Sequence, residues 1–464
     1  MKLFDLLTPG LVLLLGSTAY SLTLEQYMDA VKTKNKIFSA LDSSKEAAND
    51  KLTAGDIGLS PVITAGYSLI TDKTFPSALG NRREIEEYSL GVSKRFVTGT
   101  SLSLTGKTNE FENDVAFPND KYSTGGLGIT LSQSLWRDFF GAGTRIRQER
   151  EQTLNQFDNL RIELQIRATT FDAESVFWDY TFAQEDLRLK KSNLERAQRL
   201  EKWTSNRVSN GISDRADLMN VKALAALREV QFATAQDEIK TQETKFREYM
   251  SLPDTDKTPV ADDDMIQPRN YLDQLIKNKG VVKIDLYLSS LEAKTKQLIA
   301  DEIKDQSRPD LALVAGYNTS AYNRDYSEMA RNISRTDYPR TFIGLNFSWM
   351  FDSTAKSAQV SAATKDALAS KYIAERNLTL GRNAWTDLIR KYEITKRNVS
   401  TLEKVANYQR ERAKAEQDKF NKGRSVTFNV VTAETDAAEA EVNLLRAKAS
   451  LRKLEASSIL FIAL

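Results

Sequence analysis

Two long tracts without helix-breaking residues dominate this sequence. None of the nine prolines lies between Pro118 and Pro253, and none follows Pro339. After Gly143 the first tract contains one glycine, Gly211. Both tracts are rich in Ala, Leu, Glu, Lys, Arg and Gln, which favour the helical state. The distribution of proline and glycine therefore predicts very long helices in each half of the chain.

Gly211 lies in the middle of the first helical tract, and after Gly344 the second contains only Gly381 and Gly423. Gly211 and Gly423 each follow a basic residue by four positions, Arg207 or Lys419. Glycine adopts a positive φ at a helix end without steric cost. We therefore predict a helical hairpin that reverses at each glycine. The stretch from about Thr144 to Ser205 corresponds to roughly 90 Å of helix at 1.5 Å per residue.

A seven-residue hydrophobic repeat marks the last helical segment as a close-packed seam. The matching seam in the first half is less regular, and Arg228 interrupts it. The second-half seam consists of Ala433, Ala437, Ala440, Leu444, Ala447, Leu451 and Leu454; the first-half seam consists of Val221, Ala225, Phe232, Ala235 and Ile239.

Other segments alternate apolar with small polar residues, which is typical of half-buried β-strands. Alternation by itself also suits a small soluble β domain. Two facts favour membrane strands: one repeat has too few strands for a sandwich, and aromatic residues cluster where strand gives way to helix, as in an interfacial girdle. The alternating segments include 65–69, 88–92, 127–135 and 343–349, and the aromatic residues are Trp136, Phe139, Phe140, Trp349 and Phe351.

The two halves follow one plan, which indicates an internal duplication. In each, a helical stretch stops at a proline, Pro61 or Pro309, and an Ala-Gly-Tyr strand follows. Lys2, a short apolar run and Ser17-Thr18-Ala19 are typical of a cleaved signal peptide. We predict a signal peptide at 1–19, a first repeat at 20–250 with strands at about 59–136 and its tip near 211, a proline-rich linker at 251–270, and a second repeat at 271–464 with strands at about 309–351 and its tip near 423.

The composition excludes most kinds of catalytic chemistry. The chain has no histidine and no cysteine, so imidazole catalysis, thiolate chemistry and the common zinc and iron–sulfur sites are excluded. The net charge of +2 is too small to attract nucleic acid electrostatically. Because 28% of the residues are charged, the chain is not a polytopic helical membrane protein. We predict a non-enzyme with no catalytic residue, no cofactor and no metal site.

Taken together, these patterns resemble the TolC family of outer-membrane efflux channels over essentially the whole mature chain. The resemblance rests on the start at Leu22–Gln26, the paired Pro…Ala-Gly-Tyr strands, the segment Leu131–Leu135 before a long helix, the two basic-x-x-x-Gly tips and the duplicated plan. It implies a homotrimer with a β-barrel in the lipid of the outer membrane of a Gram-negative bacterium. It also implies a periplasmic α-helical coiled-coil barrel that docks a periplasmic membrane-fusion adaptor and an inner-membrane pump.

The resemblance also assigns roles to particular residues. It implies an adaptor-docking tip at Arg207, Gly211, Lys419 and Gly423. It implies a periplasmic entrance at Asp217, Asn220, Asn429 and Thr432, and membrane-interface aromatics at Trp136, Phe139, Trp349 and Phe351. In the best-known member of the family, aspartates just after the second tip glycine line the closed entrance; this chain has Asn429 and Thr432 there, so an acidic constriction is in doubt.

Several alternatives stay open at this stage. The chain could be the exit duct of a tripartite efflux or type I secretion system, or a periplasmic coiled-coil scaffold that transports nothing. A simple porin does not fit the predicted helical content. An extra pair of alternating segments, Tyr88–Thr98 and Thr100–Phe111, leaves the barrel at twelve or eighteen strands, because Lys94 and Arg95 within it also suit a fold over the channel mouth. The exported substrate is not encoded in any of these patterns.

Overall fold

A computed structural model describes residues 21–72, 82–113, 120–262, 272, 276–277 and 280–463. The predicted signal peptide at 1–19 and the linker residues 263–270 lie outside this part of the chain. The chain divides into two compact units. The helical unit comprises Met1–Ser43, Ile162–Ile284 and Leu380–Leu464, and the sheet unit comprises Ser44–Arg161 and Asp285–Thr379.

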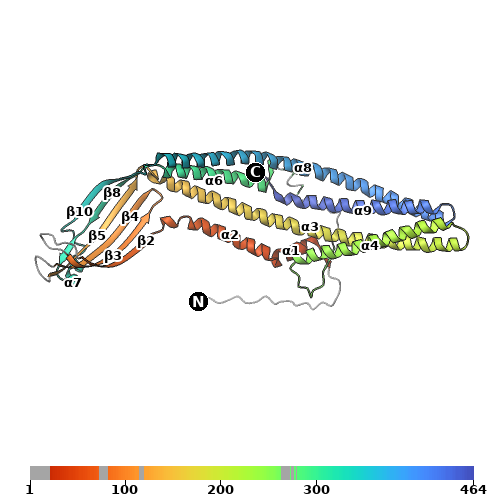
Figure 1. The fold of residues 1–464 in the computed structure, drawn as a ribbon, viewed down its shortest axis with the longest axis horizontal. Helices are drawn as coiled ribbons and strands as arrows, with labels where there is room; N and C mark the ends of the chain where they lie inside the picture. The colour runs from red at the N-terminus through yellow and green to blue at the C-terminus, as the bar shows by residue number, and fades with distance from the viewer. Residues whose placement is uncertain are drawn as a thin grey trace. The chain divides into compact units, whose positions relative to one another are not determined.

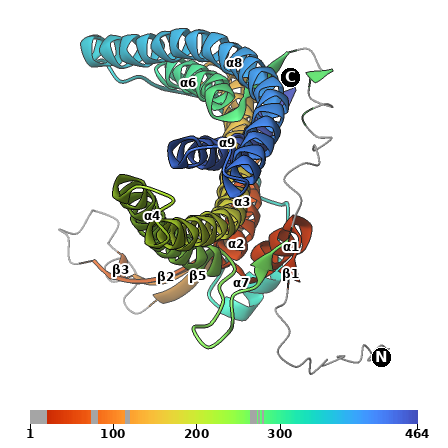
Figure 2. The same ribbon diagram turned by 90° about the vertical axis from the view of Figure 1, so that its right-hand side faces the viewer.

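Two very long helices contribute residues to both units, as the lack of helix breakers predicts. They are α3 (Ala142–Ser209, 68 residues) and α8 (Ser353–Asn421, 69 residues). Each is followed by a turn and a returning helix, α4 (Arg215–Tyr249) or α9 (Thr427–Ser457). In the helical unit, α4 lies beside α3 and α9 lies beside α8 (Figures 1 and 2). The two predicted helical hairpins are therefore confirmed.

The remaining elements of the helical unit are short. Helix α1 (Leu24–Lys34) begins with a capping box, in which Thr23 and Gln26 exchange side chain–backbone hydrogen bonds. It is followed by α2 (Lys36–Ala54), of which the residues from Ser44 onward belong to the sheet unit. Two small sheets complete the unit: β1 (Ser21–Leu22) pairs with β6 (Val260–Ala261), and β7 (Val281–Lys283) pairs with β11 (Phe461–Ala463), which follows the 3₁₀ turn η3 (Ser458–Leu460).

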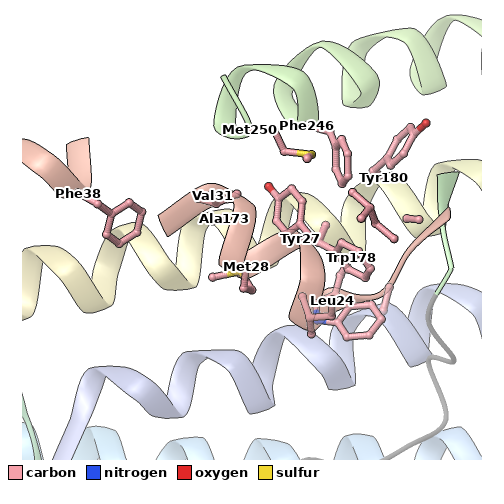
Figure 3. Close-up of a cluster of buried hydrophobic side chains, with 14 residues drawn as sticks. Leu24, Tyr27, Met28, Val31, Phe38, Ala173, Trp178, Tyr180, Phe246 and Met250 are labelled. Carbon is pink, nitrogen blue, oxygen red and sulfur yellow. The ribbon is translucent and has the colours of Figure 1, made fainter. Parts of the chain in front are cut away.

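The main core of the helical unit forms where α1 packs against α3 and α4 (Figure 3). Tyr27 lies at its centre and is fully buried. Its ring stacks on Phe246 with centroids 4.6 Å apart and lies 5.3 Å from the ring of Phe177. The Tyr27 hydroxyl is buried without a hydrogen-bond partner among the described residues, and burial raises the pKa of Tyr27. This ring therefore acts as a hydrophobic side chain, with a hydroxyl group that is not stabilised.

We expect Tyr27→Phe to stabilise the helical unit, because it keeps the ring contacts and removes an unsatisfied buried hydroxyl that costs about 1–3 kcal/mol. Tyr27→Ala should destabilise it by about 3–5 kcal/mol, because it leaves a cavity among Phe177, Phe246 and their neighbours. Thermal unfolding of the purified protein checks both variants. A melting temperature that falls for Tyr27→Phe would show that the hydroxyl has a stabilising partner.

The seven positions of the predicted seam in α9 are all buried or half-buried, so the seam is confirmed. The interpretation of Arg228 as an interruption of the matching seam in α4 was wrong. Arg228 is 6% exposed and is buried in line with Val221 and Ala225. Its guanidinium donates to the Gln231 side chain at 2.8 Å. Burial lowers the pKa of Arg228, and the nearby Glu434 carboxylate opposes that shift.

The sheet unit is built on one antiparallel sheet with the strand order β10-β8-β5-β4-β3-β2, and the short β9 also pairs with β5 (Figure 1). Its strands are β2 (Val62–Thr71), β3 (Arg82–Arg95), β4 (Thr100–Asn113), β5 (Asp120–Ser134), β8 (Asp310–Asn318), β9 (Ala321–Asn323) and β10 (Arg340–Ser348). Its other elements are η1 (Ile57–Leu59), η2 (Phe139–Gly141), α6 (Ile284–Gln306) and α7 (Tyr326–Asn332).

The extra pair of alternating segments forms β3 and β4. The first ends at Arg95 instead of Thr98, and the connecting turn has Gly99 at φ +70°. These two strands lie inside the sheet, because β3 pairs with β2 and β4 pairs with β5 over their lengths. The first half of the chain thus supplies four long strands and the second half supplies two.

A polar corner joins this hairpin turn to the start of α3. The buried Asp138 carboxylate accepts hydrogen bonds from the backbone N–H and hydroxyl of Thr144 at 2.6 and 2.9 Å, and it pairs with Arg95 at 2.8 Å. The backbone N–H of Asp138 donates to the buried Asp305 carboxylate at 3.0 Å. Next to it, Gly141 adopts φ +82°. The corner therefore fixes the sheet to α3 and α6 through buried, charge-assisted hydrogen bonds.

Candidate functional site

The two hairpin tips share one backbone geometry. Gly211 adopts φ +71° and Gly423 adopts φ +70°. In the first tip the backbone N–H of Ile212 donates to the Arg207 carbonyl at 2.8 Å. In the second tip the backbone N–H of Arg424 donates to the Lys419 carbonyl at 2.8 Å. Both turns are Schellman caps, in which the basic residue of the motif supplies the carbonyl that closes the helix. This confirms the predicted role of the glycines in the chain reversal.

The surroundings of both glycines are open. A Cβ atom built at Gly211 or Gly423 would meet no atom within 4 Å. Apolar side chains near the tips are also exposed, among them Ile212 and Phe428. Each tip therefore presents free surface around its glycine.

The two basic residues of the tips have different surroundings. The Arg207 guanidinium lies 4.7 Å from the ring centre of Trp203 and 5.2 Å from that of Phe420, so it bridges the two hairpins through cation–π contacts. Lys419 instead lies at the surface and pairs with Glu416 at 2.7 Å. The Lys419 hydrogen bond, together with one from Ser425, holds the pKa of Glu416 below its usual value.

The four predicted entrance residues lie in the first two turns of the returning helices. Asp217 is half-buried in the first turn of α4 and accepts a hydrogen bond from the Ser213 hydroxyl at 2.7 Å. Asn220 and Asn429 are exposed, and Thr432 is half-buried. Among the described residues no hydrogen bond joins the α4 pair to the α9 pair. The second tip carries no carboxylate at these positions, whereas the first keeps Asp217.

A charged cluster between the hairpins is not apparent from the sequence. Arg196 of α3 pairs with Glu434 of α9 at 2.9 Å, and Arg410 of α8 pairs with Glu441 of α9 at 2.9 Å. Glu441 is 7% exposed and also lies 3.8 Å from Arg196. The Arg196 contacts join helices that lie far apart in the sequence, whereas Arg410–Glu441 joins the two helices of the second hairpin. Their sequence signal is weak, because each residue resembles the solvated charges around it.

The second candidate surface is one face of the sheet. The strand pairing places most of the apolar residues of the six long strands on the same face, because directly paired residues share a face. The opposite face carries mostly Gly, Ser, Thr and Asn. The apolar face consists of Ile63, Ala65, Tyr67 and Leu69 of β2, Tyr88, Leu90 and Val92 of β3, Leu102 and Leu104 of β4, Leu127, Ile129 and Leu131 of β5, Leu311, Leu313, Ala315 and Tyr317 of β8, and Ile343, Leu345 and Phe347 of β10.

The predicted interface aromatics lie at one end of this sheet and are exposed. Trp136 and Phe139 follow β5, and Trp349 and Phe351 follow β10. The last two rings pack edge to face with centroids 5.4 Å apart. Phe351 is 82% exposed. Large aromatic side chains so exposed in a single chain mark a surface that another phase or partner covers.

The described residues contain no cluster of three or more His, Cys, Asp or Glu suited to a metal ion. None of the helices in the described ranges is both long and apolar enough to cross a membrane.

Comparison with known proteins gives matches among solved structures only. No family profile matches the sequence, and no curated protein matches it. The outer-membrane channel OprN is 16% identical with a TM-score of 0.66, over 94% of this chain and 89% of OprN. VceC, an outer-membrane protein of Vibrio cholerae, is 11% identical with a TM-score of 0.66, over 94% of each chain. The open-state MtrE outer-membrane channel of Neisseria gonorrhoeae is 13% identical with a TM-score of 0.64, over 94% of this chain and 88% of MtrE.

This chain has the fold of the TolC-family outer-membrane channels. The match extends over both units, so the long helical hairpins and the antiparallel sheet both belong to the TolC fold. The mainly helical fold with a sheet domain that the resemblance implies is thereby confirmed. Within one chain of this fold the sheet is open, with β2 at one edge and β10 at the other.

Proposed function

We propose that this protein is the outer-membrane exit duct of an export system, through which substrates pass passively from the periplasmic side to the exterior. The observation that carries the proposal is the continuous apolar face across six strands, bounded by exposed aromatic residues. Such a face would be costly in water, and lipid acyl chains are its natural partner. The proposed location is the outer membrane of a Gram-negative bacterium, with the helical hairpins in the periplasm.

The height of the apolar face matches that of a membrane. Along β3 and the residue that follows it, apolar side chains occur from Tyr88 to Phe96, and Glu84, Glu86 and Glu87 restore charge before Tyr88. The eight steps between these two residues, at about 3.3 Å each and tilted by about 40°, span roughly 20 Å. Outer-membrane barrels carry an apolar band of about 25 Å between aromatic girdles. The aromatics Trp136, Phe139, Trp349 and Phe351 would then anchor the periplasmic boundary.

The two charged residues that speak against membrane insertion of this hairpin are accommodated. Arg95 points to the polar face and pairs with Asp138. Lys94 lies on the apolar face, one position before the end of β3, and its ammonium lies 5.4 Å from the centre of the Phe96 ring. A lysine so close to the boundary can extend its charge to the interface while its stem stays in lipid.

The polar face would line an aqueous conduit. Its side chains are small and mostly uncharged, for example Ser89, Ser103 and Thr130, and they offer hydrogen bonds without strong selectivity. The proposed channel binds no cofactor and catalyses no reaction. Substrate choice would then lie with an inner-membrane pump, so both drug efflux and type I protein secretion fit this conduit.

At the periplasmic end, we assign Gly211 and Gly423 with Arg207 and Lys419 to a docking tip for a periplasmic membrane-fusion adaptor. The open space around both glycines supports this assignment, because it lets a partner helix approach the backbone closely. Arg207 would act indirectly, since its guanidinium holds the two hairpins together. The entrance would be lined by Asp217, Asn220, Asn429 and Thr432, and the two uncharged α9 positions predict weak block by divalent cations.

The experiment is fractionation of cells that produce the full chain, followed by conductance of the purified protein in planar lipid bilayers. We expect outer-membrane recovery, heat-modifiable gel mobility, a homotrimer by mass in detergent, and stepwise conductance. A protein recovered from the soluble periplasm without channel activity would instead be the coiled-coil scaffold, and the export proposal would be wrong.

A further inference from the structure

One dipeptide in the first hairpin tip is chemically distinct from the rest of the chain. Asn210-Gly211 is the single asparagine–glycine pair in the 464 residues, and no aspartate–glycine pair occurs. It lies in the turn between α3, which ends at Ser209, and α4 (Figure 1). An asparagine followed by glycine cyclises more readily than other asparagines, because glycine has no Cβ to hinder attack by its backbone nitrogen.

The surroundings of this pair leave room for cyclisation. Asn210, Gly211 and Ile212 are all exposed. In the part of the chain that the structure describes, the Asn210 side-chain amide makes no hydrogen bond that would hold it away from the backbone. A Cβ atom built on Gly211 would meet no atom within 4 Å. A five-membered ring between the Asn210 side chain and the Gly211 nitrogen therefore meets no steric barrier from the rest of the tip.

Two backbone hydrogen bonds slow the reaction without preventing it. The N–H of Gly211 donates to the Val208 carbonyl at 3.0 Å, and the N–H of Asn210 donates to the Asn206 carbonyl at 3.1 Å. The Gly211 nitrogen must leave its partner before it attacks, so the last turn of α3 has to open. Helix ends open at low free energy. We therefore expect cyclisation in the folded chain, at a lower rate than in the unfolded chain.

The other asparagines near the tips lack this combination. Lys422 occupies the place of Asn210 in the second tip, and Asn421 precedes that lysine. The predicted entrance residues Asn220 and Asn429 each precede a valine inside a helix. A β-branched side chain shields the backbone nitrogen beside it. The reaction is thus expected at the first tip and not at the second.

We propose that Asn210 is a site of spontaneous deamidation, which converts it to aspartate and isoaspartate and adds a negative charge to the first tip. The Gly211 nitrogen loses its proton to hydroxide and bonds to Cγ of Asn210. The Cγ–Nδ2 bond then breaks, and Nδ2 leaves as ammonia with a proton from water. Water opens the resulting succinimide: cleavage of the new Cγ–N bond gives aspartate, and cleavage of the original peptide bond gives isoaspartate. Water is the sole co-reactant, and nothing is oxidised or reduced.

The product changes both the charge and the backbone of the tip. The new carboxylate lies at the C-terminal end of α3, where the helix dipole disfavours negative charge. Isoaspartate also adds a methylene to the main chain directly before Gly211, whose positive φ closes the Schellman cap. We expect the modified tip to dock an adaptor less well, so that export falls as the protein ages. This effect on export rests on the proposed function, whereas the chemistry at Asn210 does not.

Peptide mass spectrometry tests the modification. The purified full-length protein is kept in mildly alkaline heavy-oxygen water at physiological temperature, and the peptide that contains Asn210 is followed over days. We expect conversion of the amide to an acid that contains one heavy oxygen atom, together with isoaspartate that an isoaspartate methyltransferase labels. The rate should rise in proportion to the hydroxide concentration, because the deprotonated glycine nitrogen is the nucleophile.

Two variants serve as controls. Gly211→Ala places a Cβ beside the attacking nitrogen in a position with open space, so it should keep the turn and slow the reaction severalfold. Asn210→Gln would have to form a six-membered ring and should give no product. An unmodified Asn210 peptide in the folded protein after the unfolded chain has reacted completely would overturn the proposed site. Equal rates in the native and Gly211→Ala chains would do the same.

Export in living cells tests the consequence. Asn210→Asp, which carries the charge from the start, should lose part of the export that Asn210→Gln retains at equal oligomer content. Equal export by the two variants would overturn the effect on docking. Failure of the proposed function is distinguishable from these outcomes, because it would appear as absence of the unmodified protein from the outer membrane and would leave the mass spectra unchanged.

Discussion

Replacing Gly141 with alanine is expected to abolish accumulation of the folded protein. Gly141 adopts φ +82°. A Cβ there would overlap the Val97 carbonyl oxygen, and it would lie 2.7 Å from the Val97 carbonyl carbon and 2.9 Å from the Thr98 carbonyl carbon. These are backbone atoms of the β3–β4 turn, so no side-chain rotation relieves the clash. The turn would have to separate from the start of α3, and the buried Asp138 corner would open with it.

Gly211→Ala is the matched control, because Gly211 has a similar φ of +71° but open space where a Cβ would lie. It should cost on the order of 1 kcal/mol and leave the protein folded. The measurement is the amount of heat-modifiable oligomer in outer-membrane fractions. Normal amounts of the Gly141→Ala oligomer would show that the β3–β4 turn does not depend on close contact with η2.

Gly423→Trp is expected to abolish export while the protein still assembles and reaches the outer membrane. A Cβ at this position would have no atom within 4 Å, so the expected cost is the roughly 1 kcal/mol of the positive φ. In the proposed docking arrangement, the tryptophan side chain would lie between the tip and the adaptor helix and would prevent their contact. The loss should therefore appear in export and leave folding intact.

The test measures export in living cells beside oligomer content and the conductance of the purified channel. Gly58→Trp is the control, because Gly58 also faces open space but lies in the sheet unit, far along the chain from either tip. It should export normally. Asp217→Ala should have a milder effect on conductance, because Asn429 and Thr432 already leave the second tip uncharged. Normal export by Gly423→Trp would place the docking surface elsewhere.

Much of the fold is predictable from local patterns. Helix breakers give the extents of α3 and α8 to within a few residues, because no proline interrupts either helix, although α8 continues through Gly381. The two tip glycines are equally predictable, since the Schellman cap requires a positive φ that glycine alone adopts cheaply. Period-two alternation locates the strands, although it places the end of β3 at Thr98 instead of Arg95. The docking and entrance roles at the tips stay predictions.

The sequence by itself determined the secondary structure, the chain reversals and the absence of imidazole and thiol chemistry, because each follows from residue identity or from neighbours within one or two turns. Only the tertiary structure decided the partners of Arg207, Arg228 and Arg196, since these side chains meet residues of other helices and look like surface charges in the sequence. It also decided that the β3–β4 hairpin lies within the sheet. Strand order depends on backbone pairing between distant segments, and local periodicity specifies which face a residue occupies but not which strand lies beside it.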